Sequence, residues 1–212
     1  MMTHCARLQL YASSAEASSE YSSSLWAASQ ATGEPSWSNR CGAGLGYSWA
    51  PAEHTMDQRW LRLTFDTALY VSAIHVWEAA QPKEASGFVR RAVAIEPDGT
   101  PHEYWSGDDD TNCGSVFSLT DEAQTSYPVA QVMLYTQTQS IGYEHIDAVR
   151  IDGTTCPPSD PCDCSSVETG CVRHAIAWNP RPAYQHSRGQ WAVVGGVRRY
   201  HAAWLSCRRH GQ

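Results

Sequence analysis

The sequence lacks several features that would assign it to a common class. It has no run of about 18 consecutive apolar residues, so we expect no membrane span. Its first residues contain no apolar signal-peptide core, and no Asn-x-Ser/Thr glycosylation site occurs. The His-Glu-x-x-His, Gly-x-Ser-x-Gly and phosphate-loop patterns are also missing. The one compact acid–base group, Glu53, His54 and Asp57, has no nucleophile beside it. We therefore predict that the protein is not an enzyme.

Charge is scarce and unevenly distributed. Charged residues make up 17% of the 212 residues, and the formal net charge is −7. All 22 acidic residues lie at or before Glu168, together with 8 of the 15 basic ones, so this part carries −14. The remainder carries seven arginines and no acid. An acidic body argues against nucleic acid as the partner, whereas the basic tail suits an anionic surface or the acidic body itself.

Short strand signals follow one another along the first 150 or so residues, with no helical period between them. Trp (9) and Tyr (10) outnumber Phe (3), which is typical of half-buried strands and ligand-facing loops. Residues 13–24 and the Gly- and Pro-containing stretch 25–59 indicate loops. The sequence predicts an all-β antiparallel sandwich or jelly roll. Its expected strands are residues 8–12, 60–65, 71–77, 88–95, 102–105, 116–119, 129–135 and 145–151.

The composition changes after the last expected strand. We predict a β-sandwich over residues 8–153, a Cys-rich linker over 154–171 and a poorly ordered basic tail over 172–212. The eight cysteines, an even number, favour an oxidising compartment, so we expect an extracellular or cell-surface protein, with a cytoplasmic one as the alternative.

Two cysteines lie within loops of the expected sandwich. Loops gather at the two ends of a sandwich, so we predict a Cys41–Cys113 disulfide if both loops share an end, and two free buried thiols otherwise. In the linker, two local disulfides among Cys156, Cys162, Cys164 and Cys171 are favoured over zinc, because paired Cys-x₂-Cys spacing is missing. The sequence leaves open the connectivity of Cys5, Cys156, Cys162, Cys164, Cys171 and Cys207.

Several segments in the same order resemble the discoidin-like (factor 5/8 type C related) branch of the galactose-binding-domain superfamily. They are Leu10–Ser14, Tyr21–Trp26, Ala28–Pro35, Trp60–Phe65, Val71–Pro82 and Ile146–Ile151. The resemblance implies a sandwich that binds glycans, lipids or protein partners, often with a structural calcium ion. Two positions depart from the family pattern: His145 replaces a Glu, and Gln81-Pro82-Lys83 replaces an Asn-Pro-Gly turn.

Aromatic residues in the expected loops are the candidates for a sugar site. Flat rings stack on sugar faces, and neighbouring polar side chains bind hydroxyl groups. The alternative is that these rings belong to the core or to strand faces. The candidate ligand-binding residues are Trp37, Asn39, Arg40, Trp49 and Trp105.

An acidic loop is the candidate for a metal site. Asp108, Asp109, Asp110 and Asn112 offer hard oxygen ligands at close spacing, which suits a structural Ca²⁺, although the EF-hand pattern is absent. A solvated acidic loop is the alternative. Taken together, the sequence predicts a carbohydrate- or ligand-binding module of a secreted or cell-surface protein, with a glycan or glycoprotein as partner. A protein-interaction module of a larger assembly and an accessory domain of an enzyme are the alternatives.

Overall fold

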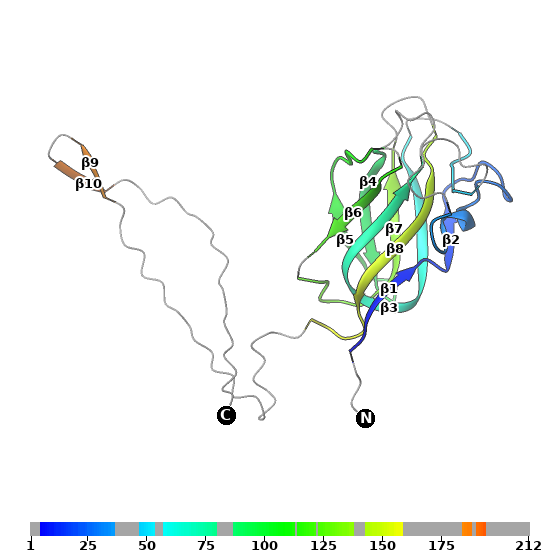
Figure 1. Cartoon of the computed structure of the whole chain (residues 1–212), viewed down its shortest axis with the longest axis horizontal. Coiled ribbons are helices and arrows are strands. Elements are labelled where there is room, and N and C mark those ends of the chain that lie inside the picture. The colour runs from blue at the N-terminus through cyan, green and yellow to red at the C-terminus, as the bar shows by residue number, and fades with distance from the viewer. Residues whose placement is uncertain are drawn as a thin grey trace. The chain divides into compact units, whose positions relative to one another are not determined.

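The computed structural model describes residues 5–36, 47–53, 57–79, 87–112, 114–121, 123–137 and 143–158, and the backbone of 184–187 and 190–193. The chain divides into two units, Met1–Pro158 and Ser159–Gln212. The first unit contains β1 (Arg7–Tyr11), β2 (Ser14–Ala17), β3 (Arg59–Glu78), β4 (Val89–Ile95), β5 (Pro101–Ser106), β6 (Val116–Thr120), β7 (Val129–Thr136) and β8 (Ile146–Thr154) (Figure 1). In the second, the antiparallel pair β9 (Tyr184–Ser187) and β10 (Gln190–Val193) lies within the predicted tail.

The long strand β3 belongs to both layers of an antiparallel sandwich. Its first half, Arg59–Thr64, lies between β2 and β7, and its second half, from Tyr70 to Glu78, lies between β8 and β6. One layer therefore has the order β2–β3–β7–β4–β5 and the other β1–β8–β3–β6. The register with β7 shifts between Thr64 and Leu69, where the strand passes from one layer to the other. The predicted antiparallel β-sandwich is confirmed, with strands 60–65 and 71–77 merged into one element.

Alternation along β3 creates the core between the layers. Leu61 and Leu63 from the first half and Ile74 and Val76 from the second half are fully buried. Because side chains of a strand point alternately to its two faces, each half contributes every second residue to the same core. Among the described residues, no helix is long and apolar enough to cross a membrane.

Two short elements lie in segments that the sequence indicated as loops. Residues 13–24 contain β2, and the stretch 25–59 contains the 3₁₀ helix η1 (Ala28–Ala31). The loop prediction for 13–24 is wrong in part because an edge strand needs only one apolar face, and here Ala15 and Ala17 supply it. In η1 the buried Ala28 and Ala31 pack against the core.

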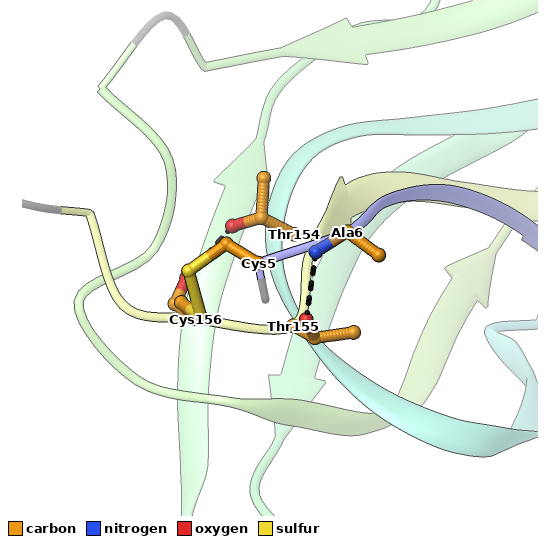
Figure 2. The surroundings of a disulfide bond; sticks show 5 residues. All are labelled: Cys5, Ala6, Thr154, Thr155 and Cys156. Carbon is orange, nitrogen blue, oxygen red and sulfur yellow. Dashed lines mark hydrogen bonds between the residues drawn. A yellow bond between two sulfur atoms is a disulfide. The ribbon is translucent and has the colours of Figure 1, made fainter. Parts of the chain in front are cut away.

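A disulfide joins the segments that flank the first and last strands of the sandwich, β1 and β8. β1 and β8 pair with Arg7 opposite Thr154, and continuing this register places Cys5 opposite Cys156. The two cysteines are bonded with Cα atoms 5.3 Å apart, and the backbone N–H of Ala6 donates to the hydroxyl oxygen of Thr155 over 3.1 Å beside them (Figure 2). Cys156 is therefore not part of a local linker disulfide as predicted, because strand pairing brings a residue 151 positions away directly opposite it.

Candidate functional site

Four strand ends meet at one end of the sandwich, which we call the loop end (Figure 1). Glu78, the last residue of β3, pairs with Ile146, the first of β8. Thr136, at the end of β7, pairs with Val89 at the start of β4. The connecting residues that the structure describes there include 47–53, 107–112 and 143–145. Loops held by a rigid scaffold in this way are common places for binding residues.

Most of the buried polar side chains in the described part of the chain lie at the loop end. Thr125 lies elsewhere; the other buried polar or charged residues are Ser48, Glu78, Asp109, Thr136, Glu144, His145 and Asp147. Buried polar groups must find hydrogen-bond partners. Here the hydroxyl of Thr136 donates to Glu144, and the hydroxyl of Ser36 donates to Asp147 over 2.8 Å. The end is thus built as a polar layer and not as an extension of the apolar core.

His145 is held in this layer as a neutral imidazole. Its Nδ1 lies 3.0 Å from the hydroxyl of Ser48, and its Nε2 is buried with no hydrogen-bond partner in the described part of the chain. Burial lowers the pKa of His145 to about 4 because water no longer solvates the charged ring. At neutral pH the ring is therefore uncharged.

The predicted acidic metal site is not assembled as a unit. Asp108, Asp110 and Asn112 are exposed, whereas Asp109 turns inward and is buried. Its carboxylate accepts from the backbone N–H groups of Thr111, at 2.8 Å, and Val89, at 3.4 Å. No group of three or more His, Cys, Asp or Glu side chains among the described residues has the geometry of a metal site. The four predicted ligands therefore do not converge, because Asp109 satisfies backbone donors on the inner side of the loop.

Glu78 carries the other inward-facing carboxyl group of this region. Its Oε2 accepts from the N–H of Gly87 over 3.0 Å, and its carboxyl group also hydrogen-bonds to the side chain of Asp109. Burial, and then the neighbouring carboxyl of Asp109, raise the pKa of Glu78 to about 10. Sequence reasoning missed Glu78, because its position at the end of a strand gives no sign that it faces an acidic loop.

The structure also corrects one aromatic candidate. Trp49 is fully buried, its indole N–H donates to the carbonyl of Ser19 over 3.0 Å, and a β-bridge joins it to Ile146. That bridge draws the ring into the core, so neither face is open to a sugar. Other predicted residues lie outside the described part of the chain, namely Trp37, Asn39, Arg40, Cys41, His54, Gln81–Lys83 and Cys113.

Trp105, the remaining aromatic candidate, is turned inward by an irregularity in β5. Ala92 pairs with Trp105 and Val93 pairs with Glu103, so Tyr104 is an extra residue in the strand. Such a β-bulge interrupts the alternation of faces and redirects side chains. As a result, the adjacent Tyr104 and Trp105 both pack against the core, although neither is fully buried.

These two aromatic residues line a groove whose other residues belong to β6 and the residue that follows it. Figure 1 shows where the edge strands β5 and β6 lie in the sandwich. The groove has a volume of about 350 Å³ and is formed by Tyr104, Trp105, Ser118, Leu119, Thr120 and Asp121. The ring of Trp105 contacts Phe117 edge-on with centroids 5.1 Å apart, which fixes its orientation. The groove therefore has a rigid aromatic wall.

The polar groups of the groove come from Tyr104 and Asp121. The Tyr104 hydroxyl is buried and has no hydrogen-bond partner among the described residues. Burial, followed by the charge of Asp121, raises the pKa of Tyr104, so its hydroxyl keeps the proton and can donate it in a hydrogen bond. Asp121 is exposed and offers carboxylate acceptors. An aromatic surface beside a hydroxyl donor and a carboxylate acceptor is an arrangement that suits a polyhydroxylated ligand.

Comparison with protein families gives a match over most of the chain. Residues 2–166 match the model of a family described as pappalysin-1, SD scarf domain, C-terminal. The comparison with curated proteins gives no significant match.

The solved structures to which the chain is similar include carbohydrate-binding modules. The family 32 module of NanJ from C. perfringens, solved in complex with galactose, aligns with a TM-score of 0.51 and 15% identity, over 68% of this chain and 99% of that one. Chitosan-binding module 1 of a chitosanase/glucanase from Paenibacillus sp. IK-5 aligns with a TM-score of 0.46 and 17% identity, over 65% and 92% of the two chains. The first match shows that the chain has the β-sandwich fold that the sequence resemblance predicted.

Proposed function

Because the chain belongs to the pappalysin-1 C-terminal SD scarf domain family, we propose that it is a non-catalytic, extracellular module that binds carbohydrate in the groove between β5 and β6. The observation that carries the proposal is the pairing of Tyr104 and Trp105 in that groove. A bulge presents both rings on one side, and Asp121 lies at the same groove.

Each residue of the groove that we consider can contact a particular group of a sugar ring. The half-buried face of Trp105 suits the C–H groups of a pyranose ring. The unpaired Tyr104 hydroxyl donates to a sugar oxygen, and the carboxylate of Asp121 accepts from sugar hydroxyls. A ligand hydroxyl that satisfies Tyr104 gains a hydrogen bond that the protein by itself leaves unmade. The similar NanJ module was solved with galactose, which makes galactosides the first ligands to test.

A non-catalytic role is supported by where the titratable groups lie. Two serine–imidazole contacts occur among the described residues: one joins Ser118 to His75 on β6 and β3, and the other joins Ser48 to His145 at the loop end. Ser48 and His145 are buried, with exposures of 0% and 3%, so a substrate would have no access to the Ser48 hydroxyl. The pair therefore serves packing and hydrogen bonding in the polar layer. The extracellular assignment is supported by the Cys5–Cys156 disulfide, since such bonds persist in oxidising compartments.

A glycan array probed with the full 212-residue chain tests the function, and titration calorimetry with the best ligand tests the site. We expect enrichment of a defined class of glycan. Trp105→Ala should weaken its binding more than tenfold because the stacking surface is removed. Tyr104→Phe, which removes only one oxygen atom, should weaken it about fivefold, in line with the loss of one hydrogen bond.

Trp60→Ala is the matched control, because Trp60 is a half-buried β3 residue that does not line the groove. Its glycan affinity should stay within twofold of that of the unmodified chain, and thermal melting should confirm that all three variants fold. Absence of enrichment for any glycan contradicts the proposed function. Binding that survives both Trp105→Ala and Tyr104→Phe places the sugar outside this groove.

Protein binding is the second candidate, and it rests on a different surface. Tyr21, Leu25 and Tyr47 are large apolar residues that are 52%, 48% and 53% exposed. The ring of Tyr21 packs edge-on against Trp26 and Tyr143, with centroids 5.2 and 5.6 Å apart, which makes it part of a preformed aromatic cluster. Exposed aromatic clusters of this kind are common at protein interfaces. A Tyr21→Ser, Leu25→Ser double variant that loses a cell-surface protein partner but keeps its glycan affinity would favour this role.

A further inference from the structure

The groove between β5 and β6 runs along the edge of a β-strand. Four consecutive residues, 118–121, line one of its walls. Because the side chains of a strand point alternately to its two faces, four consecutive residues border the same groove where that groove follows the main chain. Among the described strands, β6 pairs with β3 alone, so its other edge has no partner strand. A ligand in the groove therefore lies along the open edge of β6.

The register of β6 shows which main-chain groups face that open edge. The N–H of Asp121 donates to the carbonyl of Ser72, so the main-chain N–H at position 121 points toward β3. In an antiparallel pair this direction alternates from one residue to the next. Ser118 and Thr120 therefore turn their N–H and carbonyl groups away from β3 and toward the groove. These two sets of donors and acceptors lie about 7 Å apart along the strand.

The side chains around this edge supply an aromatic surface and a negative charge. Tyr104 and Trp105 form the aromatic wall, and Asp121 is the one charged residue among the described residues that line the groove. The Asp121 Oδ1 accepts from the N–H of Ala123 over 3.0 Å, which fixes the carboxylate beside the groove. Burial, and then the charge of Asp121, raise the pKa of Tyr104 and the pKa of Tyr127. The electrostatic potential in this region is therefore negative.

These features select a ligand by its length and its charge. A single pyranose ring that stacks on Trp105 can reach the main-chain groups of Ser118 or those of Thr120, whereas binding both sets requires a second ring in the same chain. Sugar hydroxyls donate to the carboxylate of Asp121, and an ammonium group forms an ion pair with it. A carboxylate or sulfate group on the sugar is repelled, because like charges interact unfavourably at short range.

We propose that the groove binds at least two consecutive sugar residues of an uncharged or amino-substituted linear glycan, and that it rejects glycans with carboxylate or sulfate groups. The inference rests on the proposed carbohydrate-binding function and adds to it the length and the charge of the ligand. One ring stacks on Trp105, and the chain continues along the main-chain groups of Ser118 and Thr120. Asp121 sets the preference for charge.

Titration calorimetry of the full chain with three sets of β-1,4-linked oligomers tests the proposal. The sets are built from galactose, glucosamine and glucuronic acid, and each contains one to four residues. For galactose or glucosamine, the affinity should rise about tenfold from one residue to two, because the second ring adds hydrogen bonds to the edge of β6. The glucuronic acid oligomers should bind about tenfold more weakly than uncharged oligomers of the same length.

One pair of variants tests the role of the main chain. Thr120→Pro removes the N–H that faces the groove, at an edge position where a strand tolerates proline. Its affinity for the two-residue oligomer should fall to within about threefold of that for the single sugar. Thr120→Ala is the control, because it keeps the N–H and changes only the side chain, and its affinities should stay within about twofold of those of the unmodified chain. Thermal melting checks that both variants fold.

A second pair of variants tests the role of charge. In Asp121→Asn, the glucuronic acid oligomers should bind within about threefold of the uncharged ones, because the repelling carboxylate is gone. Asp98→Asn is the matched control: it removes the same charge from an exposed acid of the β4–β5 turn that does not line the groove, and the discrimination should remain.

The outcomes separate this inference from the function on which it rests. If the glycan array gives no enrichment, both are wrong. If the array finds a ligand, the inference alone is overturned by any of three results: no galactose or glucosamine oligomer binds, a single sugar binds as tightly as two, or the glucuronic acid oligomers bind as tightly as the uncharged ones. These three results come from the unmodified chain, so they decide the question even where Thr120→Pro does not fold. Unchanged affinities in a folded Thr120→Pro variant would also contradict the role of the β6 edge.

Discussion

The two ends of the sandwich differ in how their strands are connected and in which side chains they bury. At the end opposite the loop end, the β4–β5 connection is a tight turn in which Gly99 donates to the carbonyl of Glu96, and Asp98 accepts from the N–H of Thr100. There, the Cys5–Cys156 disulfide links the residues just before β1 to those just after β8. At the loop end, by contrast, the structure buries the carboxyl groups of Glu78 and Asp109. The first end is held by a tight turn and a disulfide. The second end keeps polar groups buried, which lowers stability and is common at binding sites.

The largest effect should come from opening the disulfide. In the Cys5→Ala, Cys156→Ala double variant, the unfolded chain regains the freedom of a loop that spans 151 positions, and the chain-entropy account gives a loss of about 5 kcal/mol. Denaturant unfolding followed by tryptophan fluorescence measures it. A loss below about 1 kcal/mol would show that strand pairing between β1 and β8 already restrains the termini.

A smaller loss should follow from adding one methyl group at the same end. A Cβ atom on Gly153 would lie 2.3 Å from the carbonyl oxygen of Tyr70, which belongs to the backbone and cannot move aside easily. We expect Gly153→Ala to reduce the free energy of unfolding by about 3 kcal/mol. Gly33→Ala is the control, because nothing lies within 4 Å of its Cβ position and only its φ of +75° is unfavourable; it should lose about 1 kcal/mol. Equal losses in the two variants would contradict the steric explanation.

At the loop end, Glu78 should make stability depend on pH. Its pKa is raised from 4.5 to about 10, so between these values the folded chain keeps a proton that the unfolded chain has released. Stability must therefore fall as the pH rises, and raising it from 6 to 8 should cost about 2 to 3 kcal/mol. In Glu78→Gln this slope should vanish, because the neutral amide can accept from Gly87 and donate to Asp109. Urea unfolding at both pH values measures the difference, and an unchanged slope in the variant would assign it to another group.

His145 should produce a slope of the opposite sign at lower pH. Its pKa falls from 6.5 to about 4 on folding, so between these values the unfolded chain binds a proton that the folded chain does not. Stability should decrease by about 2 kcal/mol as the pH falls from 6.5 to 5. The effect is measured most clearly in Glu78→Gln, where the opposing slope is absent. The further exchange His145→Asn keeps a polar group next to Ser48 and should abolish it; a slope that persists there would contradict the assignment.

Most of the fold was readable from local pattern. The alternation in Leu61, Leu63 and Phe65 predicted a strand with one buried face, and the structure has that face in the core. Pattern of this kind depends only on residues near one another in the chain. The short edge strand β2 was missed because Ser, Ala and Glu carry little periodic signal, although pairing with β3 still holds that segment in place.

The candidate site was harder to predict, because it depends on which segments meet. Trp49 and Trp105 were equivalent as loop aromatics in the sequence. A bridge to Ile146 buries the first, and a bulge in β5 exposes part of the second to a groove. In the same way, Asp109 could not be distinguished from Asp108 and Asp110 until the structure placed it against Glu78.

The sequence by itself therefore determined the fold class, the acidic body, the positions of most strands and the resemblance to the discoidin-like branch, because each of these is encoded in composition or in short-range periodicity. The tertiary structure alone decided the partner of Cys156, the environment of Glu78 and the assembly of the Tyr104–Trp105 groove. These features depend on strand register, and register arises from contacts between residues far apart in the chain, which no local pattern records.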